Sequence, residues 1–424
     1  MRGPKQSMGQ MERASAQPAS AQPVGTPKGD SELPHILVGV THDQTCLILA
    51  GRLRALREAG FRVTLVSSPG PQLKQIATRE NVQCVELRME RGISPFRDCI
   101  SLWKLFRLLC RLKPDVTEFS TPKAGLLGTL AARMAGIRRR VYLLRGLRME
   151  TTTGLKGHLL LLAEKLAASS AHSVLCNSES LRNECLRLAV AREPKLLILQ
   201  NGSSNGVDGQ RFSPGPSDLR WKLGIPERVV VIGFVGRLTC DKGIPELIEG
   251  FDAALDEAPD TYLLLVGWFD ESDDPLSEEL QERITNHPRI VCTGFVQDTA
   301  PYYKTMDLLI LPSRREGFPN AALEAASSGI PVIATFATGA RDAVVPGLTG
   351  ILIPKRSPAA ICAASLELIR DKKRRLRMGQ EARRWALQYF SDSDVLEATT
   401  DFYRSLVDAD ATTECVTEPV VSMR

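Results

Sequence analysis

The chain has 424 residues, of which 43% are hydrophobic and 24% charged, and its formal net charge is +5. The length exceeds an ordinary single domain and the composition is globular, which excludes a small module, a fibrous repeat and a wholly disordered chain. The net charge conceals an asymmetry, because residues 1–200 contain 30 Lys and Arg against 16 Asp and Glu, whereas residues 201–424 contain 24 against 33. A basic first half predicts an anionic partner, such as nucleic acid, anionic lipid or a phosphorylated ligand.

Residues 1–32 are rich in Ala, Gln, Ser and Pro and lack the apolar core of a signal peptide, so we interpret them as a disordered leader. Residues 409–424 are interpreted as a disordered tail. The ten cysteines form no CxxC pair, so we expect no zinc site and no disulfide framework. Cysteines that are not paired in disulfides fit a reducing environment, which favours a cytoplasmic location. The apolar runs are far shorter than the roughly 18 residues that span a bilayer.

Strands and helices alternate from residue 33 onward, which predicts a parallel, doubly wound sheet in a first domain over residues 33–205. Residues 35–40 are typical of a buried strand. The elements after it are expected, in chain order, as a helix at 47–58, a strand at 61–66, a helix ending near 113, a strand after 114, a helix at 124–134, a strand at 141–144 and a helix ending near 169.

Residues 206–227 are predicted to be a linker, because they are rich in Gly, Ser, Asp and Pro. The strand pattern then restarts, which predicts a second domain over residues 228–385 and a C-terminal helix over 386–408 that returns to the first domain. In the second domain, strands are expected at 229–235, 262–266, 290–293, 308–311 and 331–334, and a helix at 245–254. We therefore expect an α/β protein with two Rossmann-like domains that face a cleft.

A basic loop follows the first strand of the second domain. It contains Arg237 and Lys242, and Pro245 opens the helix behind it. Loops at the carboxyl ends of parallel strands, next to a helix N-terminus, commonly bind anions, so a diphosphate is the expected ligand. A solvated loop with ordinary surface cations is the alternative, and the loop alone does not separate the two.

Two glutamates lie on either side of a predicted helix start. Glu316 precedes Pro319, which suits the first turn of a helix, and Glu324 lies inside that helix. These carboxylates could accept hydrogen bonds from two polyol groups, while the backbone amides of residues 317–320 hold a charged or hydroxylated group. The alternative is an ordinary helix N-terminus, where the macrodipole favours acidic residues.

The order and spacing of these features resemble the sugar-donor domain of glycosyltransferase family 4. The resemblance rests on the basic loop, the two glutamates, the Thr-Gly-Phe-Val turn at 293–296 and the glycine-containing segments at 337–340 and 347–350. It covers about residues 35–405. It implies the two-domain GT-B fold, a nucleotide-sugar donor and transfer that retains the anomeric configuration.

The resemblance also implies a role for each matching residue. Arg237 and Lys242 would bind the diphosphate of the sugar donor, and Glu316 would bind the sugar; these three are the expected catalytic residues. Glu324 would bind the ribose. Further contacts with the sugar donor are expected from Gly39, Phe295, Val296, Gly317, Phe318, Pro319 and Asn320. Because fixed cations can meet the charge that develops on the leaving diphosphate, no metal or other cofactor is expected.

The first domain binds the acceptor in this family. Residues 120–128 resemble a segment of family members that extend undecaprenyl-diphosphate-linked glycans for capsule, O-antigen or protein glycosylation. Lys123, Arg145 and Arg148 are the expected acceptor contacts. Many relatives carry histidine at the positions of Ser120 and Arg145, so no role of those histidines is transferred to this chain.

A basic amphipathic helix is predicted within residues 96–113, with Lys104, Arg107 and Arg111 on one face. One interpretation is contact with an anionic membrane surface. The other, slightly favoured, is a helix that covers the sheet with its outer side in water.

Together these features predict a retaining, metal-independent glycosyltransferase that moves a hexose or N-acetylhexosamine from a UDP-sugar to a polyprenyl-diphosphate-linked saccharide. The expected location is cytoplasmic, on the inner face of the plasma membrane. The alternatives are a sugar-nucleotide epimerase of the same fold and a non-catalytic protein that binds sugar nucleotides. A nucleic-acid partner is not expected, because the sequence has no helix-turn-helix, RNP-type aromatic pair or zinc finger.

Overall fold

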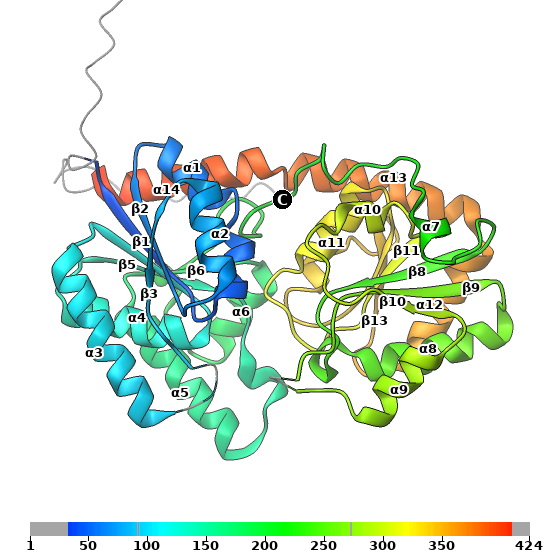
Figure 1. Ribbon diagram of the computed structural model, residues 1–424, viewed down its shortest axis with the longest axis horizontal. Coiled ribbons are helices and arrows are strands. Elements are labelled where there is room, and N and C mark those ends of the chain that lie inside the picture. The colour runs from blue at the N-terminus through cyan, green and yellow to red at the C-terminus, as the bar shows by residue number, and fades with distance from the viewer. Residues whose placement is uncertain (1–32, 91, 93, 272–273, 409–424) are drawn as a thin grey trace, which may run out of the picture. The chain divides into compact units, whose positions relative to one another are not determined.

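The computed structural model describes residues 33–90, 92, 94–271 and 274–408. The predicted leader and tail, residues 1–32 and 409–424, lie outside the described residues. Two parallel sheets lie within the unit Pro34–Arg424 (Figure 1). The predicted fold class, α/β with two Rossmann-like parallel sheets, is therefore confirmed.

The first sheet places its strands in the order β3-β2-β1-β4-β5-β6-β7, and every pairing is parallel. Ile36, Leu37 and Val38 of β1 have no exposed surface, because parallel strands are covered on both faces. The strand bounds are β1 His35–Gly39, β2 Arg62–Ser67, β3 Gln83–Glu86, β4 Val116–Ser120, β5 Arg139–Leu144, β6 Ser173–Cys176 and β7 Leu196–Leu197.

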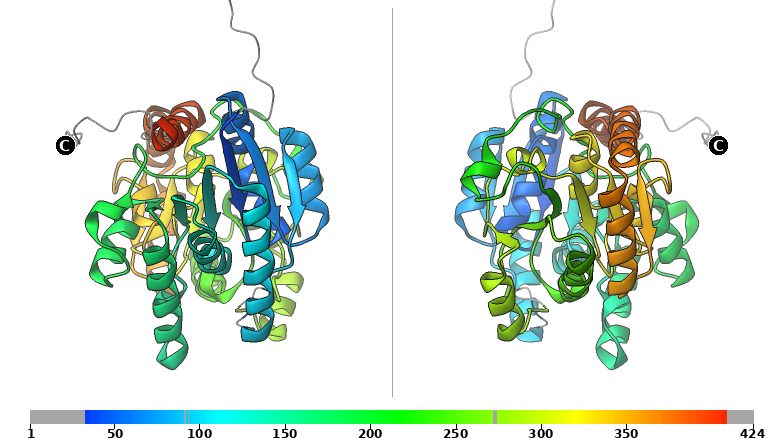
Figure 2. Two further views of the ribbon diagram at one scale, coloured as in Figure 1. Left: turned by 90° about the vertical axis from the view of Figure 1, so that its left-hand side faces the viewer. Right: turned by 90° about the vertical axis from the view of Figure 1, so that its right-hand side faces the viewer.

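Helices cover both faces of this sheet (Figures 1 and 2). Ile36 and Val38 pack with Leu53 in one core, whereas Leu37, on the opposite side of the strand, packs with Leu105 in another. The helices of this half are α1 Arg52–Glu58, α2 Pro71–Glu80, α3 Pro95–Leu112, α4 Pro122–Met134, α5 Gly154–Ser170 and α6 Glu179–Arg187.

The second sheet has the order β10-β9-β8-β11-β12-β13. Its strands are β8 Val230–Val235, β9 Thr261–Val266, β10 Ile290–Cys292, β11 Leu308–Leu311, β12 Val332–Thr335 and β13 Gly350–Ile353. The helices that follow α6 are α7 Leu219–Lys222, α8 Ile244–Glu257, α9 Glu278–Asn286, α10 Ala300–Tyr303, α11 Asn320–Ser327, α12 Pro358–Arg370, α13 Lys372–Tyr389 and α14 Asp392–Asp408.

The C-terminal helix α14 returns to the first sheet, as predicted. Tyr403 of α14 donates a hydrogen bond to Glu118 of β4, and the same carboxylate pairs with Arg52 of α1. Arg52 also donates to the carbonyl oxygen of Ser204 at 3.1 Å. Because Arg52 and Glu118 are almost wholly buried, this ion pair depends on its surroundings for solvation.

Several element boundaries differ from the predicted ones. The helix expected at 47–58 is two pieces, a 3₁₀ helix Asp43–Leu49 and α1, separated by Gly51 with φ of 81°. Glycine adopts that left-handed backbone without strain, and it breaks the helix. The predictions also lacked β3, whose residues are all at least partly exposed, so it has no apolar run. The domain boundaries, including the linker at 206–227 that contains α7, remain predictions.

The helices in the described ranges are all too short or too polar to cross a bilayer. Across the same ranges, no group of three or more His, Cys, Asp or Glu side chains is arranged to hold a metal ion.

Candidate active site

The two charged elements singled out in the second half meet in the structure. Lys242 ends a 3₁₀ turn, Cys240–Lys242, that follows β8, and Glu316 lies between β11 and α11. The Nζ atom of Lys242 lies 2.5 Å from Oε1 of Glu316, and Ser313 donates to the same oxygen at 2.7 Å. The loops that follow β8 and β11 therefore converge at the carboxyl ends of these strands, where doubly wound folds bind ligands.

Gly243 is what lets the two loops approach so closely. Its φ is 75°, and a Cβ atom there would lie 2.2 Å from the carbonyl oxygen of Pro312. Any side chain at Gly243 would push the loop of Lys242 away from the loop of Glu316.

A second ion pair ties these loops together next to the first. Arg315 Nη2 donates to Oδ2 of Asp241 at 2.8 Å, and Thr239 donates to the other oxygen of that carboxylate at 2.6 Å. Burial alone would raise the pKa of Asp241, but Lys242 and Arg315 outweigh it and lower that pKa. Asp241 therefore carries a negative charge that holds the basic loop in place.

Arg237 follows β8 and is anchored from the neighbouring strand. Its Nη1 donates to Oδ2 of Asp270 at 2.8 Å, and Asp270 lies just after β9. The side chain of Arg237 is 31% exposed, so the guanidinium still reaches solvent at the edge of the sheet.

Glu324 lies in α11, one face of which is buried. Tyr303 of α10 donates to Oε2 of Glu324 at 2.8 Å, and Thr299 donates to the same oxygen at 3.3 Å. Burial raises the pKa of Glu324, and the hydrogen bond from Tyr303 opposes this rise. The fixed Oε2 leaves Oε1 as the oxygen that a ligand could approach.

The remaining predicted contacts for the sugar donor fall into two groups. Phe295 is 49% exposed and meets Trp268 edge to face, with 5.2 Å between ring centroids. Phe318, by contrast, is 7% exposed and packs against Phe390 in the core, so only its backbone can line a site. Val296 is partly buried against the same core, and Pro319 and Asn320 form the start of α11.

Arg145, just after β5, is the most unusual of the predicted acceptor residues. Its Nη1 donates to Oγ of Ser204 at 2.8 Å, whereas Nε and Nη2 are buried without a hydrogen-bond partner among the described residues. Burial and the nearby Arg52 lower the pKa of Arg145 to about 10. Buried guanidinium nitrogens without an acceptor are costly, so Arg145 is a candidate to bind an anionic group.

Hydrogen bonds join the segment after β5 to the loops that carry Glu316. Arg315 Nε donates to Oγ1 of Thr151 at 3.0 Å, and Thr338 donates to Glu150. The amide of Glu316 in turn donates to the carbonyl oxygen of Thr338 at 2.9 Å.

The backbones also come close here, since a Cβ atom on Gly317 would lie 2.5 Å from the carbonyl oxygen of Arg145. The structure therefore brings Arg145 next to the predicted loop for the sugar donor, although Arg145 and Gly317 are 172 positions apart in the sequence.

Three other predicted residues have structural roles of their own. Lys123 contacts Asp98 of α3 at 2.6 Å. Arg148 lies near Glu164. Burial raises the pKa of Glu164, and the positive charge of Arg148 opposes part of that rise. Gly39 ends β1, where a Cβ atom would lie 2.3 Å from the ring of Phe119, so packing alone requires glycine there.

Sequence reasoning missed Ser313, Asp241, Arg315 and Thr338, which position the predicted residues. Arg315 directly precedes Glu316 in the sequence, and this adjacency was the one sequence signal that could have pointed to Arg315. The partners of the others could be identified only from the fold.

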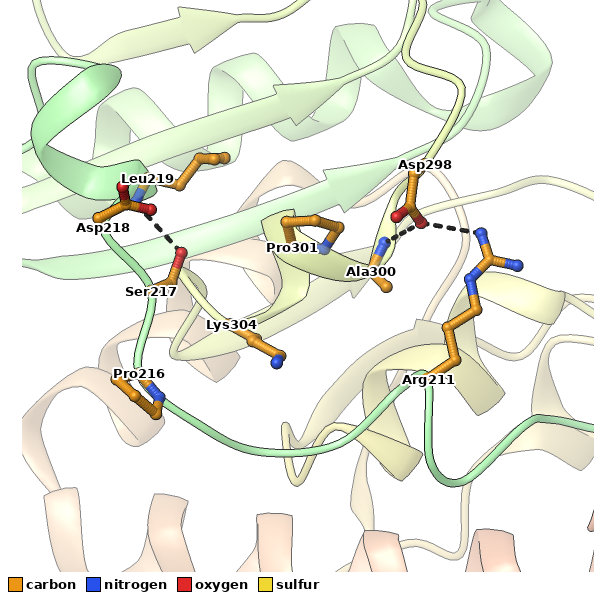
Figure 3. Close-up of a pocket in the computed structure, with 9 residues that line it drawn as sticks. All are labelled: Arg211, Pro216, Ser217, Asp218, Leu219, Asp298, Ala300, Pro301 and Lys304. Atoms are coloured by element: carbon orange, nitrogen blue, oxygen red, sulfur yellow. Dashed lines mark hydrogen bonds and ion pairs between the residues drawn. The ribbon is translucent and has the colours of Figure 1, made fainter.

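A pocket lies elsewhere on the second half, between the segment before α7 and the start of α10 (Figure 3). Arg211 and Asp298 form an ion pair of 2.8 Å at one side of it, and the side chain of Lys304 extends into it. None of the predicted site residues lines this pocket.

Comparisons with known proteins cover both halves of the chain. The family model described as "Glycosyl transferase 4-like domain" matches residues 49–202, and the one described as "Glycosyl transferases group 1" matches residues 229–371. The capsular polysaccharide biosynthesis glycosyltransferase CapM of Staphylococcus aureus is 34% identical over 87% of this chain and 96% of its own length.

Two further similarities are informative. The UDP-Gal:alpha-D-GlcNAc-diphosphoundecaprenol alpha-1,3-galactosyltransferase of Escherichia coli is 28% identical over 75% of this chain and 82% of its own length. The crystal structure of Anabaena Alr3699/HepE in complex with UDP and glucose has a TM-score of 0.72 at 21% identity, and covers 87% of this chain and 99% of its own. That last likeness concerns the fold alone.

Proposed function

Since this chain belongs to glycosyltransferase family 4, we propose that it transfers a hexose or N-acetylhexosamine from a UDP-sugar to a polyprenyl-diphosphate-linked saccharide, with retention of configuration. The observation that carries the proposal is the convergence of Lys242 and Glu316 at 2.5 Å, with Arg237 on the same loop as Lys242. The Escherichia coli relative is named for a UDP-sugar and a diphosphoundecaprenol-linked acceptor, which supports both substrate classes.

The charges at this point suit the chemistry of glycosyl transfer. As the bond between the anomeric carbon and the diphosphate breaks, negative charge builds on the leaving UDP and positive charge on the sugar ring. Lys242 and Arg237 would meet the first charge, and the carboxylate of Glu316 would hold hydroxyl groups of the sugar. Fixed cations of this kind can stabilise the leaving group without a metal ion, so we propose metal-independent transfer.

We propose that residues 33–205 hold the acceptor and residues 228–385 the sugar donor, with residues 206–227 as the linker. Arg145 is the main support on the acceptor side, because its buried Nε and Nη2 lack acceptors among the described residues. A diphosphate offers several anionic oxygens to such a group. The reaction would take place on the cytoplasmic face of the membrane in which the lipid is embedded.

Nucleotide binding tests the proposal most directly. Because a ligand at 100 times its Kd stabilises the folded state by about 2.7 kcal/mol, saturating UDP should raise the Tm of its domain by roughly 5–10 °C. We expect UDP and one UDP-sugar to stabilise the chain more than ADP or GDP in a thermal-shift panel. Transfer to a polyprenyl-diphosphate glycan, with the product's anomeric configuration read by NMR, then tests the acceptor and the stereochemistry. Stabilisation by a purine nucleotide alone would contradict the assignment of UDP.

The raised pKa of Glu324 makes affinity for the sugar donor depend on pH. An ionised carboxylate accepts hydrogen bonds from ribose hydroxyls, and protonation removes that capacity. As the pH falls through the raised pKa, the Kd of the preferred UDP-sugar should therefore increase, at a higher pH than an ordinary glutamate would give. Isothermal titration calorimetry at a series of pH values measures this change in Kd. The diphosphate of a UDP-sugar stays ionised over these pH values, so its own titration does not contribute.

Glu324→Gln serves as the control for this pH dependence. It should bind about 10- to 150-fold more weakly at neutral pH, since hydrogen bonds to a charged group contribute roughly 1.5–3 kcal/mol, and its Kd should not change with pH. A pH dependence that persists in Glu324→Gln would assign the titrating group elsewhere.

A further inference from the structure

Two adjacent residues of the predicted linker, Arg211 and Phe212, contact the two ends of α10. The Nη2 atom of Arg211 donates to Oδ1 of Asp298 at 2.8 Å, and the amide of Ala300, the first residue of α10, donates to the same oxygen at 3.2 Å (Figure 3). The ring of Phe212 meets the ring of Tyr303, the last residue of α10, edge to face, with 5.8 Å between ring centroids. The linker therefore holds α10 at its start and at its end.

Helix α10 is the element that fixes the carboxylate of Glu324. Thr299, which directly precedes α10, and Tyr303 both donate to Oε2 of Glu324, at 3.3 and 2.8 Å. Because α10 has only four residues, about one helical turn, a shift of either end moves one of these two donors. The position of the carboxylate thus depends on where the linker holds α10.

The linker is itself anchored to the helix that carries Glu324. The carbonyl oxygen of Phe212 accepts a hydrogen bond from Oγ of Ser327 at 2.7 Å, and Ser327 lies three residues after Glu324 in α11. The amide of Arg211 donates to Asp208 at 2.9 Å, which fixes the backbone before the side chain of Arg211 begins. The guanidinium of Arg211 lies 5.1 Å from the centre of the Phe212 ring. Arg211 and Phe212 therefore join α10 to α11.

The charge of Arg211 also acts on Glu324. Burial raises the pKa of Glu324, and the positive charge of Arg211 is one of the contributions that oppose this rise, whereas the charge of Asp298 adds to it. Arg211 thus favours the ionised carboxylate, which is the form that accepts hydrogen bonds from hydroxyl groups.

We propose that Arg211 is a positioning residue for the carboxylate of Glu324, so that the predicted linker contributes to recognition of the ribose of the sugar donor. The inference rests on the proposed function, which makes the ribose the ligand of Glu324. Arg211 acts through α10 and does not itself contact the nucleotide. Its loss should therefore weaken the binding of nucleotides that carry ribose hydroxyls and spare nucleotides that lack them, whereas a general loss of structure would weaken both alike.

The test is calorimetric titration of the full chain with UDP and with 2′,3′-dideoxyUDP, which lacks both ribose hydroxyls. The wild type should prefer UDP at least about tenfold, because the hydroxyls bond a charged group. Arg211→Gln should lower this preference about two- to fivefold, the effect of one exposed ion pair, and leave the Kd of 2′,3′-dideoxyUDP unchanged. Arg211→Lys should restore part of the preference, since it keeps the charge without the planar fork.

Tyr303→Phe interrupts the same contacts at the other end of α10. It keeps the ring that packs on Phe212 but removes the hydroxyl that bonds Glu324, so the preference for UDP should fall about two- to tenfold. In the Glu324→Gln background neither Arg211→Gln nor Tyr303→Phe should lower the preference further, because the carboxylate on which they act is gone.

Two matched controls should keep the wild-type preference. Arg370→Gln removes an exposed ion pair between Arg370 and Glu257, on helices other than α10 and α11. Tyr302→Phe removes a hydroxyl from α10, where Tyr303 rather than Tyr302 bonds Glu324. Thermal unfolding should show that each variant is folded.

The outcomes separate this inference from the proposed function. A folded Arg211→Gln or Tyr303→Phe that keeps the wild-type preference would overturn the inference alone, as would an equal loss of affinity for both nucleotides or a further fall in the Glu324→Gln background. A wild type that binds no UDP would overturn the proposed function, and this inference with it.

Discussion

Lys242→Ala should lower kcat for sugar transfer on the order of 10²- to 10³-fold, the loss commonly seen when one fixed group that stabilises transition-state charge is removed. In the structure the Lys242 ammonium lies 2.5 Å from Glu316 and is 21% exposed, so it is held at the site yet reachable by a ligand. The effect should be mainly on kcat, because charge on the leaving diphosphate develops in the transition state and the ground state needs the cation less.

The measurement is initial-rate kinetics with the preferred UDP-sugar and a lipid-diphosphate acceptor. Lys222→Ala is the matched control, because Lys222 makes an exposed ion pair with Asp218 on a short helix of the same half. That control should retain wild-type turnover, and circular dichroism should show that Lys242→Ala is folded. A folded Lys242→Ala with wild-type kcat would remove Lys242 from the catalytic group.

Glu118→Gln should destabilise the folded state by about 3–5 kcal/mol, the usual cost of leaving a buried charge without its partner. The carboxylate of Glu118 has no exposed surface, pairs with Arg52 and accepts a hydrogen bond from Tyr403 of the C-terminal helix. Burial and the charge of Arg52 lower the pKa of Arg145. Glu118 is close enough to Arg145 to oppose that decrease in part. Removing one negative charge therefore leaves two buried guanidinium groups uncompensated.

Asp401→Asn makes the same chemical change at an exposed ion pair on α14, where Asp401 contacts Arg404 at 3.0 Å. This control should change stability by less than about 1 kcal/mol, because exposed pairs contribute little. Calorimetric unfolding of both variants measures the difference. Equal stability of Glu118→Gln and the wild type would mean that the fold does not depend on this buried charge.

The sequence by itself determined the features that depend on residues close together in the chain, namely the strands, the helices and the loops between them. The alternation of apolar runs with helical patterns predicted both parallel sheets, because strand and helix periodicity is local. The sequence also placed the loop with Arg237 and Lys242 at a strand end, and Glu316 and Glu324 at a helix start. The resemblance to glycosyltransferase family 4 then assigned them to a site.

Only the tertiary structure decided which side chains meet across long separations. Glu118 joins Arg52 and Tyr403, and Arg145 comes next to Gly317, through packing that no local pattern records. The exposure of α5 is of the same kind. Its leucines surround the helix, so periodicity cannot tell which of them are covered, and only the positions of the sheet and of α4 determine that Leu155 and Leu162 remain in water.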